Sequence, residues 1–289
     1  MEASPVRYRL YLVATALLFS TGGAAIKAAT LTGWQIASFR SGVAAIALLA
    51  ALPQARRGWS WRVVPVALAY ATTLVLFVLS NRLTTAANAV FLQSTAPLYL
   101  LFLAPWLLRE PVRARDLLCA VAVAGGMALL FIGSERSVAT APDPRHGNLI
   151  GLASGLSWAL TITGLRWLGR EAISGKPHNP ALAPVALGNL LAFLIALPMA
   201  LPASSVRPSD VAVILYLGVV QIGLAYFLLT RAVRHVPAFE ATVVLLLEPV
   251  MNPVWAWLVH HERPGSWSLA GGAIVLSATV ANSWAQARR

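Results

Sequence analysis

The chain is 289 residues long, and its composition excludes an ordinary water-soluble fold. Hydrophobic residues make up 58% of it, whereas Asp, Glu, Lys and Arg make up only 11%, against about 25% in soluble domains. Such a chain has too few charged groups to cover a water-exposed surface, so lipid must be its outer solvent. Ten membrane spans would use roughly 200 residues, and the remainder leaves no room for an extramembrane domain.

The net charge of +12 raises the question of a nucleic-acid partner. Such a partner needs a clustered basic face with interleaved aromatic residues, whereas the arginines here are scattered singly and in pairs. We therefore predict no nucleic-acid partner. The single cysteine, Cys119, excludes an internal disulfide and a zinc site built on cysteines, and we predict neither a metal nor a cofactor.

Apolar stretches along the chain predict an all-α membrane protein with ten transmembrane helices. In chain order, the predicted spans are 9–28, 33–52, 62–81, 85–107, 116–133, 147–168, 180–201, 210–230, 238–259 and 267–285. The first resembles a signal peptide, because Arg7 and Arg9 precede its apolar run. Since nine further spans follow it, we interpret it as an uncleaved helix.

Lysine and arginine residues divide unequally between the two sides of the predicted membrane. With the N-terminus inside, fifteen of them fall on the inner side and six on the outer side, and Arg40 lies within a span. Loops that carry more Lys and Arg stay in the cytoplasm. The sequence therefore predicts a multi-pass protein of the cell inner membrane with both termini cytoplasmic.

An internal repeat divides the spans into two sets of five. The segment 80–120 aligns without gaps on 232–272, and the alignment matches Pro97 with Pro249 and Glu110 with Glu262. Apolar helices also align by chance, but a matched proline at constant spacing argues against chance. Because five is odd, the second half enters the membrane from the opposite side, so the sequence predicts inverted repeats, 1–140 and 141–289.

Three short motifs accompany the repeat: LLREP at 107–111, LEP at 247–249 and HHERP at 260–264. With ten helices in two halves, they resemble the drug/metabolite transporter superfamily in its EamA-domain branch. Within that branch the chain looks most like the bacterial aromatic amino acid and paraquat exporters of the YddG type. The resemblance implies one EamA domain per half, a basket of helices around a central cavity, and efflux from the cytoplasm.

Glu248 is the most informative single residue. It lies ten residues into span nine, at a depth of about 15 Å and so near the midplane, where a carboxylate must face a cavity, find a partner or be protonated. Two interpretations stay open. Glu248 either couples protons or contacts a substrate amine, or it is a structural acid that bonds backbone groups freed by Pro249.

Four helix faces combine aromatic rings with hydroxyl, amide or carboxylate groups, as a pocket for an amphipathic solute would. Any one such face is more often a packing surface, but four together favour a shared cavity. The residues that we predict to bind substrate are Tyr70, Phe77, Asn88, Gln93, Tyr99, Trp158, Thr161 and Glu248. Pro97 and Pro249 are predicted hinges, because they occupy equivalent places in the two halves.

Two basic residues lie in the outer half of spans one and two. Lys27 and Arg40 would each meet a substrate carboxylate or reach the outer headgroups. Lys27 is close to its span end, which favours the headgroups. Arg40 is seven residues in, so a carbonyl or carboxylate partner is expected for it.

The motifs of soluble enzymes are missing from the sequence. His260, His261 and Glu262 resemble the start of a zinc helix, but the second histidine of that motif is absent. No P-loop or nucleophile-elbow motif occurs either, so we predict no enzyme.

These features predict a secondary transporter that exports small-molecule substrates, namely aromatic and other neutral amino acids, by alternating access. One alternative is an exporter of cationic drugs, with Glu248 as the charge partner. Another is a membrane scaffold without transport activity, against which the polar mid-span faces argue. The sequence does not specify the oligomeric state, and a monomer would suffice.

Overall fold

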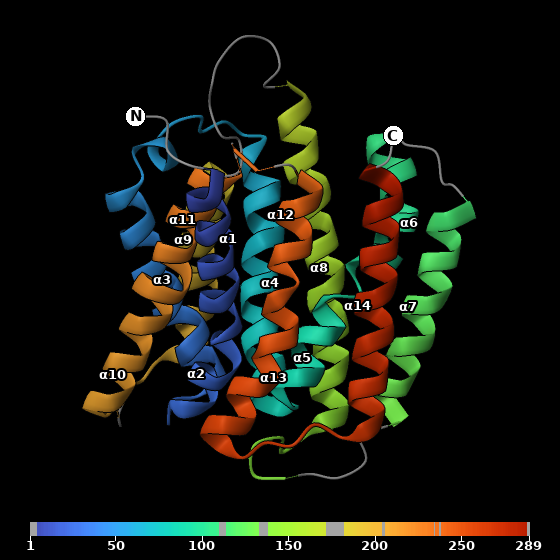
Figure 1. Ribbon diagram of the computed structural model, residues 1–289. Coiled ribbons are helices and arrows are strands. Elements are labelled where there is room, and N and C mark those ends of the chain that lie inside the picture. Colours follow the sequence, from blue (N-terminus) through green and yellow to red (C-terminus); the bar gives the residue numbers. More distant parts are fainter. Residues whose placement is uncertain are drawn as a thin grey trace.

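The computed structural model describes residues 5–109, 114–132, 138–171, 182–203, 206–233, 235–236 and 238–287, and in these segments every regular element is a helix. The predicted all-α fold is therefore confirmed. Figure 1 shows a bundle in which α1 begins and α14 ends at the same end. We call this the terminal end, and the opposite end of the bundle the distal end.

The first half of the chain forms α1 (Pro5–Ser20), α2 (Gly22–Ala28), α3 (Gly33–Ala51), η1 (Pro53–Arg56), α4 (Val63–Leu83), α5 (Ala86–Gln93), α6 (Ala96–Leu103), η2 (Ala104–Leu108) and α7 (Ala114–Ile132). The second half forms α8 (Pro144–Glu171), α9 (Leu182–Ala200), α10 (Pro208–Leu215), η4 (Tyr216–Leu224), α11 (Ala225–Ala232), α12 (Ala238–Leu245), α13 (Leu247–His260) and α14 (Ser266–Ala287).

Nine of the ten predicted spans are confirmed as helical segments long and apolar enough to cross a membrane, counted over the described residues. The tenth, predicted at 267–285, is present as α14 but does not reach the hydropathy of the other nine. Its serines, tryptophans and Asn282 lower that hydropathy. In Figure 1, α14 nevertheless runs beside α7 from the distal end to the terminal end.

Spans four and nine, which carry the predicted hinge prolines, are each interrupted. The first is interrupted at Ser94, between α5 and α6, and the second at Leu246, between α12 and α13. Pro97 and Pro249 each follow three residues later. A proline ring clashes with the carbonyl four residues before it, which here belongs to the last residue of the preceding helix.

Local sequence also sets where individual helices begin. Thr32 and Gln35 form a reciprocal capping box at the start of α3, with hydrogen bonds of 3.2 and 3.0 Å. At the start of α5, Thr85 Oγ1 accepts the backbone N–H of Asn88 at 3.1 Å. Side-chain oxygens thus satisfy donors that a helix start leaves free.

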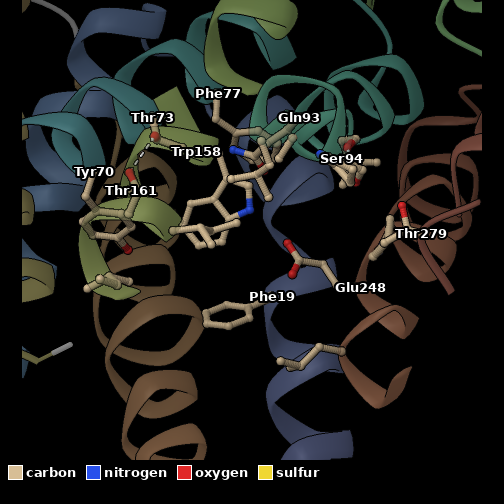
Figure 2. A pocket seen from close by; sticks show the side chains of 18 of the residues that line it. Phe19, Tyr70, Thr73, Phe77, Gln93, Ser94, Trp158, Thr161, Glu248 and Thr279 are labelled. Atoms are coloured by element: carbon tan, nitrogen blue, oxygen red, sulfur yellow. Dashed lines mark hydrogen bonds between the residues drawn. The ribbon is translucent and has the colours of Figure 1, made fainter. Parts of the chain in front are cut away.

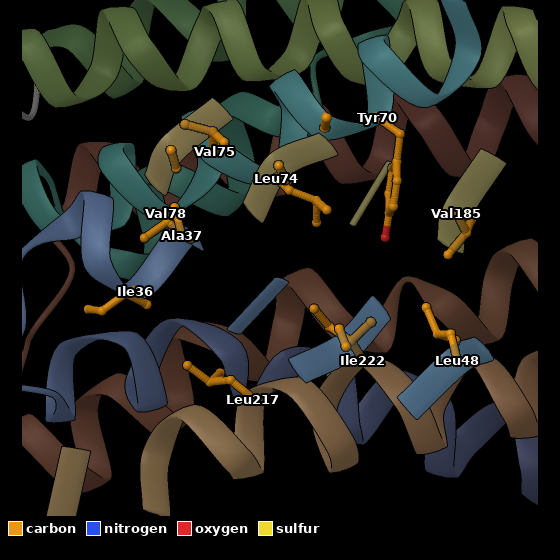
Figure 3. Close-up of a cluster of buried hydrophobic side chains, with 14 of the residues drawn as sticks. Ile36, Ala37, Leu48, Tyr70, Leu74, Val75, Val78, Val185, Leu217 and Ile222 are labelled. Atoms are coloured by element: carbon orange, nitrogen blue, oxygen red, sulfur yellow. The ribbon is translucent and has the colours of Figure 1, made fainter. Parts of the chain in front are cut away.

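Helices from the two halves of the chain pack against one another: α3 on α9, α5 on α13, α7 on α14, α4 on α8, and α1 on α11. The largest buried apolar cluster joins α3, α4, α9 and η4 and includes Ile36, Leu48 and Leu217 (Figure 3). Between α7 and α14 the backbones approach at Gly126 and Gly271. A Cβ at Gly271 would overlap the Gly126 carbonyl oxygen, so both glycines permit this contact.

Candidate functional site

A cavity of about 1020 Å³ is bordered by both interrupted spans. Gln93, Ser94 and Pro97 line it at the first interruption, and Leu246 and Pro249 line it at the second. Helices that break at membrane depth leave backbone groups free, which is tolerated where the broken segment lines a cavity. Paired breaks of this kind commonly mark the binding site of a transporter.

Six of the eight residues predicted to bind substrate line this cavity. They are Tyr70, Phe77, Gln93, Trp158, Thr161 and Glu248. These side chains come from α4, α5, α8 and α13, and Figure 2 shows them arranged around one space. Both predicted hinge prolines, Pro97 and Pro249, also line it.

Tyr99 and Asn88 do not line the cavity. The Tyr99 hydroxyl donates to the carbonyl of Leu152 at 3.1 Å, in the contact between α6 and α8. Asn88 is 2% exposed, and its amide donates to Asn148 Oδ1 at 3.3 Å near the distal end. Both were assigned to one face of a continuous helix, and the break at Ser94 removes the regular spacing on which that assignment depended.

The cavity wall is rich in aromatic rings. Trp158 and Phe77 border it opposite Phe19 in Figure 2. Phe19 meets Tyr226 edge-on, with ring centres 5.4 Å apart, and the hydroxyls of Tyr226 and Tyr70 lie 3.0 Å apart. Phe19 and Tyr226 were not predicted as wall residues, although span one aligns on span six at an offset of 139 and this alignment matches Phe19 with Trp158.

Polar groups are interleaved with these rings. Gln93 Nε2 donates to Ser154 Oγ at 3.1 Å, and the hydroxyls of Thr73 and Thr161 lie 3.5 Å apart. These contacts hold the side chains of α4, α5 and α8 in fixed positions. A solute in the cavity therefore meets apolar faces and oriented hydrogen-bonding groups at once.

Glu248 places a carboxylate in the cavity. It lies in the first turn of α13, and Figure 2 shows its carboxylate directed into the space between Trp158 and Phe19. Among the described residues, none forms a hydrogen bond or an ion pair with the Glu248 carboxylate. A structural bond to backbone freed by Pro249 is therefore not seen, and the start of α13 favours the negative charge.

Arg40 is a further lining residue. Its guanidinium Nη2 donates to the carbonyl of Leu74 at 3.1 Å, and the side chain is buried. The sequence pointed to a carbonyl or carboxylate partner for Arg40, and a carbonyl is present. Its place in the cavity wall depends on the packing of α3 against α4 and η4, which no sequence signal defines.

A buried ion pair lies at the distal end of the bundle. Lys27 Nζ, at the end of α2, lies 3.0 Å from Glu262 Oε2, and the two side chains are 4% and 2% exposed. Lys27 also donates to the carbonyl of Thr84 at 2.8 Å and to that of Thr140. Glu262 Oε1 accepts the backbone N–H of Ala86 at 2.6 Å. These contacts tie α2, α5 and the α13–α14 connection together.

The headgroup contact that the sequence favours for Lys27 is therefore wrong. A partner from the far end of the chain was available, and an ion pair compensates burial that an isolated lysine would avoid. Glu110, which the repeat alignment matches with Glu262, lies outside the described residues. Asn148 Oδ1 accepts a further bond, from Thr84 Oγ1 at 2.7 Å, and extends the network.

The cavity extends toward the terminal end. Arg115, Arg166 and Asn282, near the ends of α7, α8 and α14 at that side, belong to its lining. Lys27 and Glu262 at the distal end do not. In the described structure the cavity thus extends toward the terminal end, and the buried ion pair lies at the opposite end, outside the lining.

Comparison with family models identifies the family of this chain. A model of the EamA-like transporter family matches residues 7–132 and again residues 145–284. The chain belongs to the EamA-like transporter family. It is thus a multi-pass membrane transporter, and the cavity is its candidate transport site.

Three known proteins show what this EamA-like transporter is similar to. Pseudopaline exporter CntI of Pseudomonas aeruginosa is 27% identical over 286 residues, 95% of each chain. Uncharacterized transporter YetK of Bacillus subtilis is 31% identical over 186 residues, 62% of this chain and 54% of YetK. A solved structure with a TM-score of 0.63 and 16% identity covers 96% of this chain and 98% of its own, which shows the shared fold.

These relatives correct the narrower resemblance to exporters of the YddG type. Two relatives that align over 95% of this chain are pseudopaline exporters. In the described segments of this EamA-like transporter, no group of three His, Cys, Asp or Glu is placed to hold a metal ion. The cavity instead offers aromatic faces, amides, hydroxyls and the carboxylates of Glu248 and Asp116, and its lining also includes Arg40, Arg115 and Arg166. Such a surface suits an amphipathic solute with a charged head.

Proposed function

We propose that this transporter exports small amphipathic solutes that carry an amino group, including aromatic and other neutral amino acids. The observation that carries the proposal is the position of Glu248 in the cavity lining. Its carboxylate faces the cavity without a partner among the described residues, which is costly at membrane depth unless a proton or a cationic group compensates it. The amino group of a solute supplies that compensation, and the aromatic wall accepts its side chain.

In this proposal, Trp158, Phe77 and Tyr70 contact the apolar part of the solute. Gln93 and Thr161 bond its polar groups. A wall of this composition supports binding of both aromatic and smaller side chains, since rings provide contact area and the amide and hydroxyl orient the head.

The transport cycle proposed is alternating access by two inverted five-helix repeats, 1–140 and 141–289, with Pro97 and Pro249 as hinges. Three observations support it. The family model matches twice, the breaks at Ser94 and Leu246 are related by the repeat spacing of 152, and the helix pairs are those that related halves require. Small rotations at the two breaks would open one end as the other closes.

The terminal end is proposed to face the cytoplasm of the cell whose inner membrane holds the protein. The excess of Lys and Arg at that end supports this orientation. The state described is then open inward and closed outward by Lys27 and Glu262. A solute to be exported enters the cavity from the cytoplasm in this state.

Pseudopaline, or a solute like it, is a second candidate substrate. The full-length relative supports it by name, and the size of the cavity does so physically. A volume of about 1020 Å³ is at the upper limit for drug-sized ligands, larger than a single free amino acid needs. Both candidates use the same carboxylate and the same aromatic wall.

The test is flux through the purified protein in liposomes. Radiolabelled phenylalanine, threonine and a lipophilic cation are followed with and without a pH gradient, and pseudopaline competes with each. We expect saturable flux of at least one amino acid. Flux of the cation alone would replace the proposal with a cationic drug exporter, and no flux of any solute would favour the scaffold. A flux that does not change with the pH gradient would exclude a role of Glu248 in proton coupling.

A further inference from the structure

Arg40 is a buried charge that the transport proposal leaves unused. The residue is 2% exposed and belongs to the cavity lining. Its Nη2 donates to the Leu74 carbonyl at 3.1 Å, whereas its Nε is buried without an acceptor. Among the described residues no carboxylate lies within ion-pair distance of it.

A buried arginine without a counter-charge lowers the stability of the fold. Its five N–H donors keep their charge at any physiological pH, and a buried charge without a counter-charge destabilises a fold. Their planar fork matches the two oxygens of a carboxylate, which binds it by two parallel hydrogen bonds. Among the described residues one carbonyl bonds it instead, so most of the hydrogen-bonding capacity of Arg40 is not used by them.

The segment η4 lies close to the backbone of Arg40. This segment is a π-helix, a conformation that is frequent at functional sites, and it packs against α3. Gly218 of η4 lies against Val43 and the Arg40 carbonyl, where a Cβ would meet Val43 at 2.5 Å. Gln221 and Ile222 from the same segment then enter the cavity lining.

Arg40 and Glu248 line one cavity but do not neutralise each other. They form no ion pair within 4.0 Å. The cavity therefore contains separate positive and negative groups, and the aromatic ring of Tyr70 lines the same cavity. A zwitterion compensates both charges, whereas a simple cation compensates Glu248 alone.

We infer that Arg40 binds the carboxylate of the transported solute and thereby restricts the substrate class to amino carboxylates, with the amine at Glu248. This inference rests on the proposed export function. It separates the two substrate classes that Glu248 alone does not distinguish, because an amine without a carboxylate leaves Arg40 uncompensated.

The test is competition against radiolabelled phenylalanine bound to the purified full-length protein. The competitors are phenylalanine, phenylalaninamide and phenethylamine, which keep the ring and the amine and differ at the carboxylate. For wild type we expect the two compounds without a carboxylate to compete at least about tenfold more weakly, since hydrogen bonds between charged groups are lost.

Variants then assign the effect to Arg40. Arg40→Gln should weaken phenylalanine about tenfold and leave phenethylamine unchanged, and Arg40→Lys should recover part of the preference. Arg82→Gln is the matched control. Arg82 also donates to a backbone carbonyl at 3.1 Å, that of Ala29, but it does not line the cavity, so the preference should persist.

Two results would overturn the inference. The first is equal competition by phenylalanine and phenethylamine in wild type, which decides the question even if Arg40→Gln does not fold. The second is an equal loss of both ligands in Arg40→Gln, which would make the residue structural. Failure of the export proposal looks different, because then no compound of the series binds or is transported and both proposals fall.

Discussion

The ion pair between Lys27 and Glu262 gives a direct way to open the distal end. Lys27→Met removes the cation and leaves the Glu262 carboxylate buried, with the backbone N–H of Ala86 as its remaining donor. The proposed cycle requires this pair to separate when the outer side opens. The cost of the substitution therefore falls on the described, distally closed state.

The magnitude follows from the burial of both side chains, which are 4% and 2% exposed. Removing one partner from such a pair costs about 3–5 kcal/mol, because the other charge stays buried and uncompensated. If that cost applies to the closed state alone, the balance between closed and open states moves by about a hundredfold to a few thousandfold. Lys27→Met with Glu262→Gln removes both charges and should reverse most of this shift.

The assay uses the fact that Cys119 is the single cysteine. In a Cys119→Ser background, Ser94→Cys places one thiol in the cavity lining, where a membrane-impermeant maleimide reports access from each side. We expect labelling from the terminal end with Lys27 present, and labelling from the distal end about a hundredfold faster in Lys27→Met. Arg9→Met breaks the partly exposed pair with Glu240 and is the control that should change nothing at the distal end.

An unchanged rate of distal labelling in folded Lys27→Met protein would refute the reasoning. It would mean that the ion pair does not hold the distal end closed. The reasoning would also be contradicted if the double variant Lys27→Met with Glu262→Gln were labelled as fast as Lys27→Met. The unpaired Glu262 carboxylate would then not be the cause of the faster distal labelling.

Three further outcomes are expected. Trp158→Ala should weaken transport of phenylalanine several-fold more than that of threonine, and an equal loss would make Trp158 structural. Thr32→Ala breaks the capping box with Gln35 and should lower stability by about 1 kcal/mol in thermal unfolding, with transport retained. In the loop before α8, hydrogen bonds from the backbone and ring of His146 hold the pKa of Asp143 below its usual 3.8. This stabilisation is present above pH 3.8 and is lost as the pH falls through the lower folded-state pKa, so the melting temperatures of wild type and Asp143→Asn should converge there.

The spans were predictable because an apolar stretch of about twenty residues is long enough to cross the hydrocarbon core and is unusual in a soluble domain. Span three, predicted at 62–81, is α4 at Val63–Leu83. The breaks were only half predictable. Pro97 and Pro249 indicate a local disturbance, but whether a helix kinks or ends depends on what packs around the freed backbone.

The candidate site was predictable where one helix face stayed regular. Tyr70 and Phe77 lie on the unbroken α4, and Trp158 and Thr161 on the unbroken α8, and all four line the cavity. Asn88 was placed by extending a face across a break, and this failed. Contacts between distant segments, such as that of Lys27 with Glu262, depend on tertiary packing that helical spacing does not encode.

Transport by the variant Glu248→Gln tests the central claim most directly. Glutamine keeps the shape and removes the charge, so amine binding in the cavity should be lost with the fold intact. Glu240→Gln is the matched control in the other half of the same span, since Glu240 pairs with Arg9 and does not line the cavity. We predict that phenylalanine counterflow in liposomes falls at least about tenfold in Glu248→Gln and persists in Glu240→Gln. Wild-type counterflow in Glu248→Gln would contradict the account.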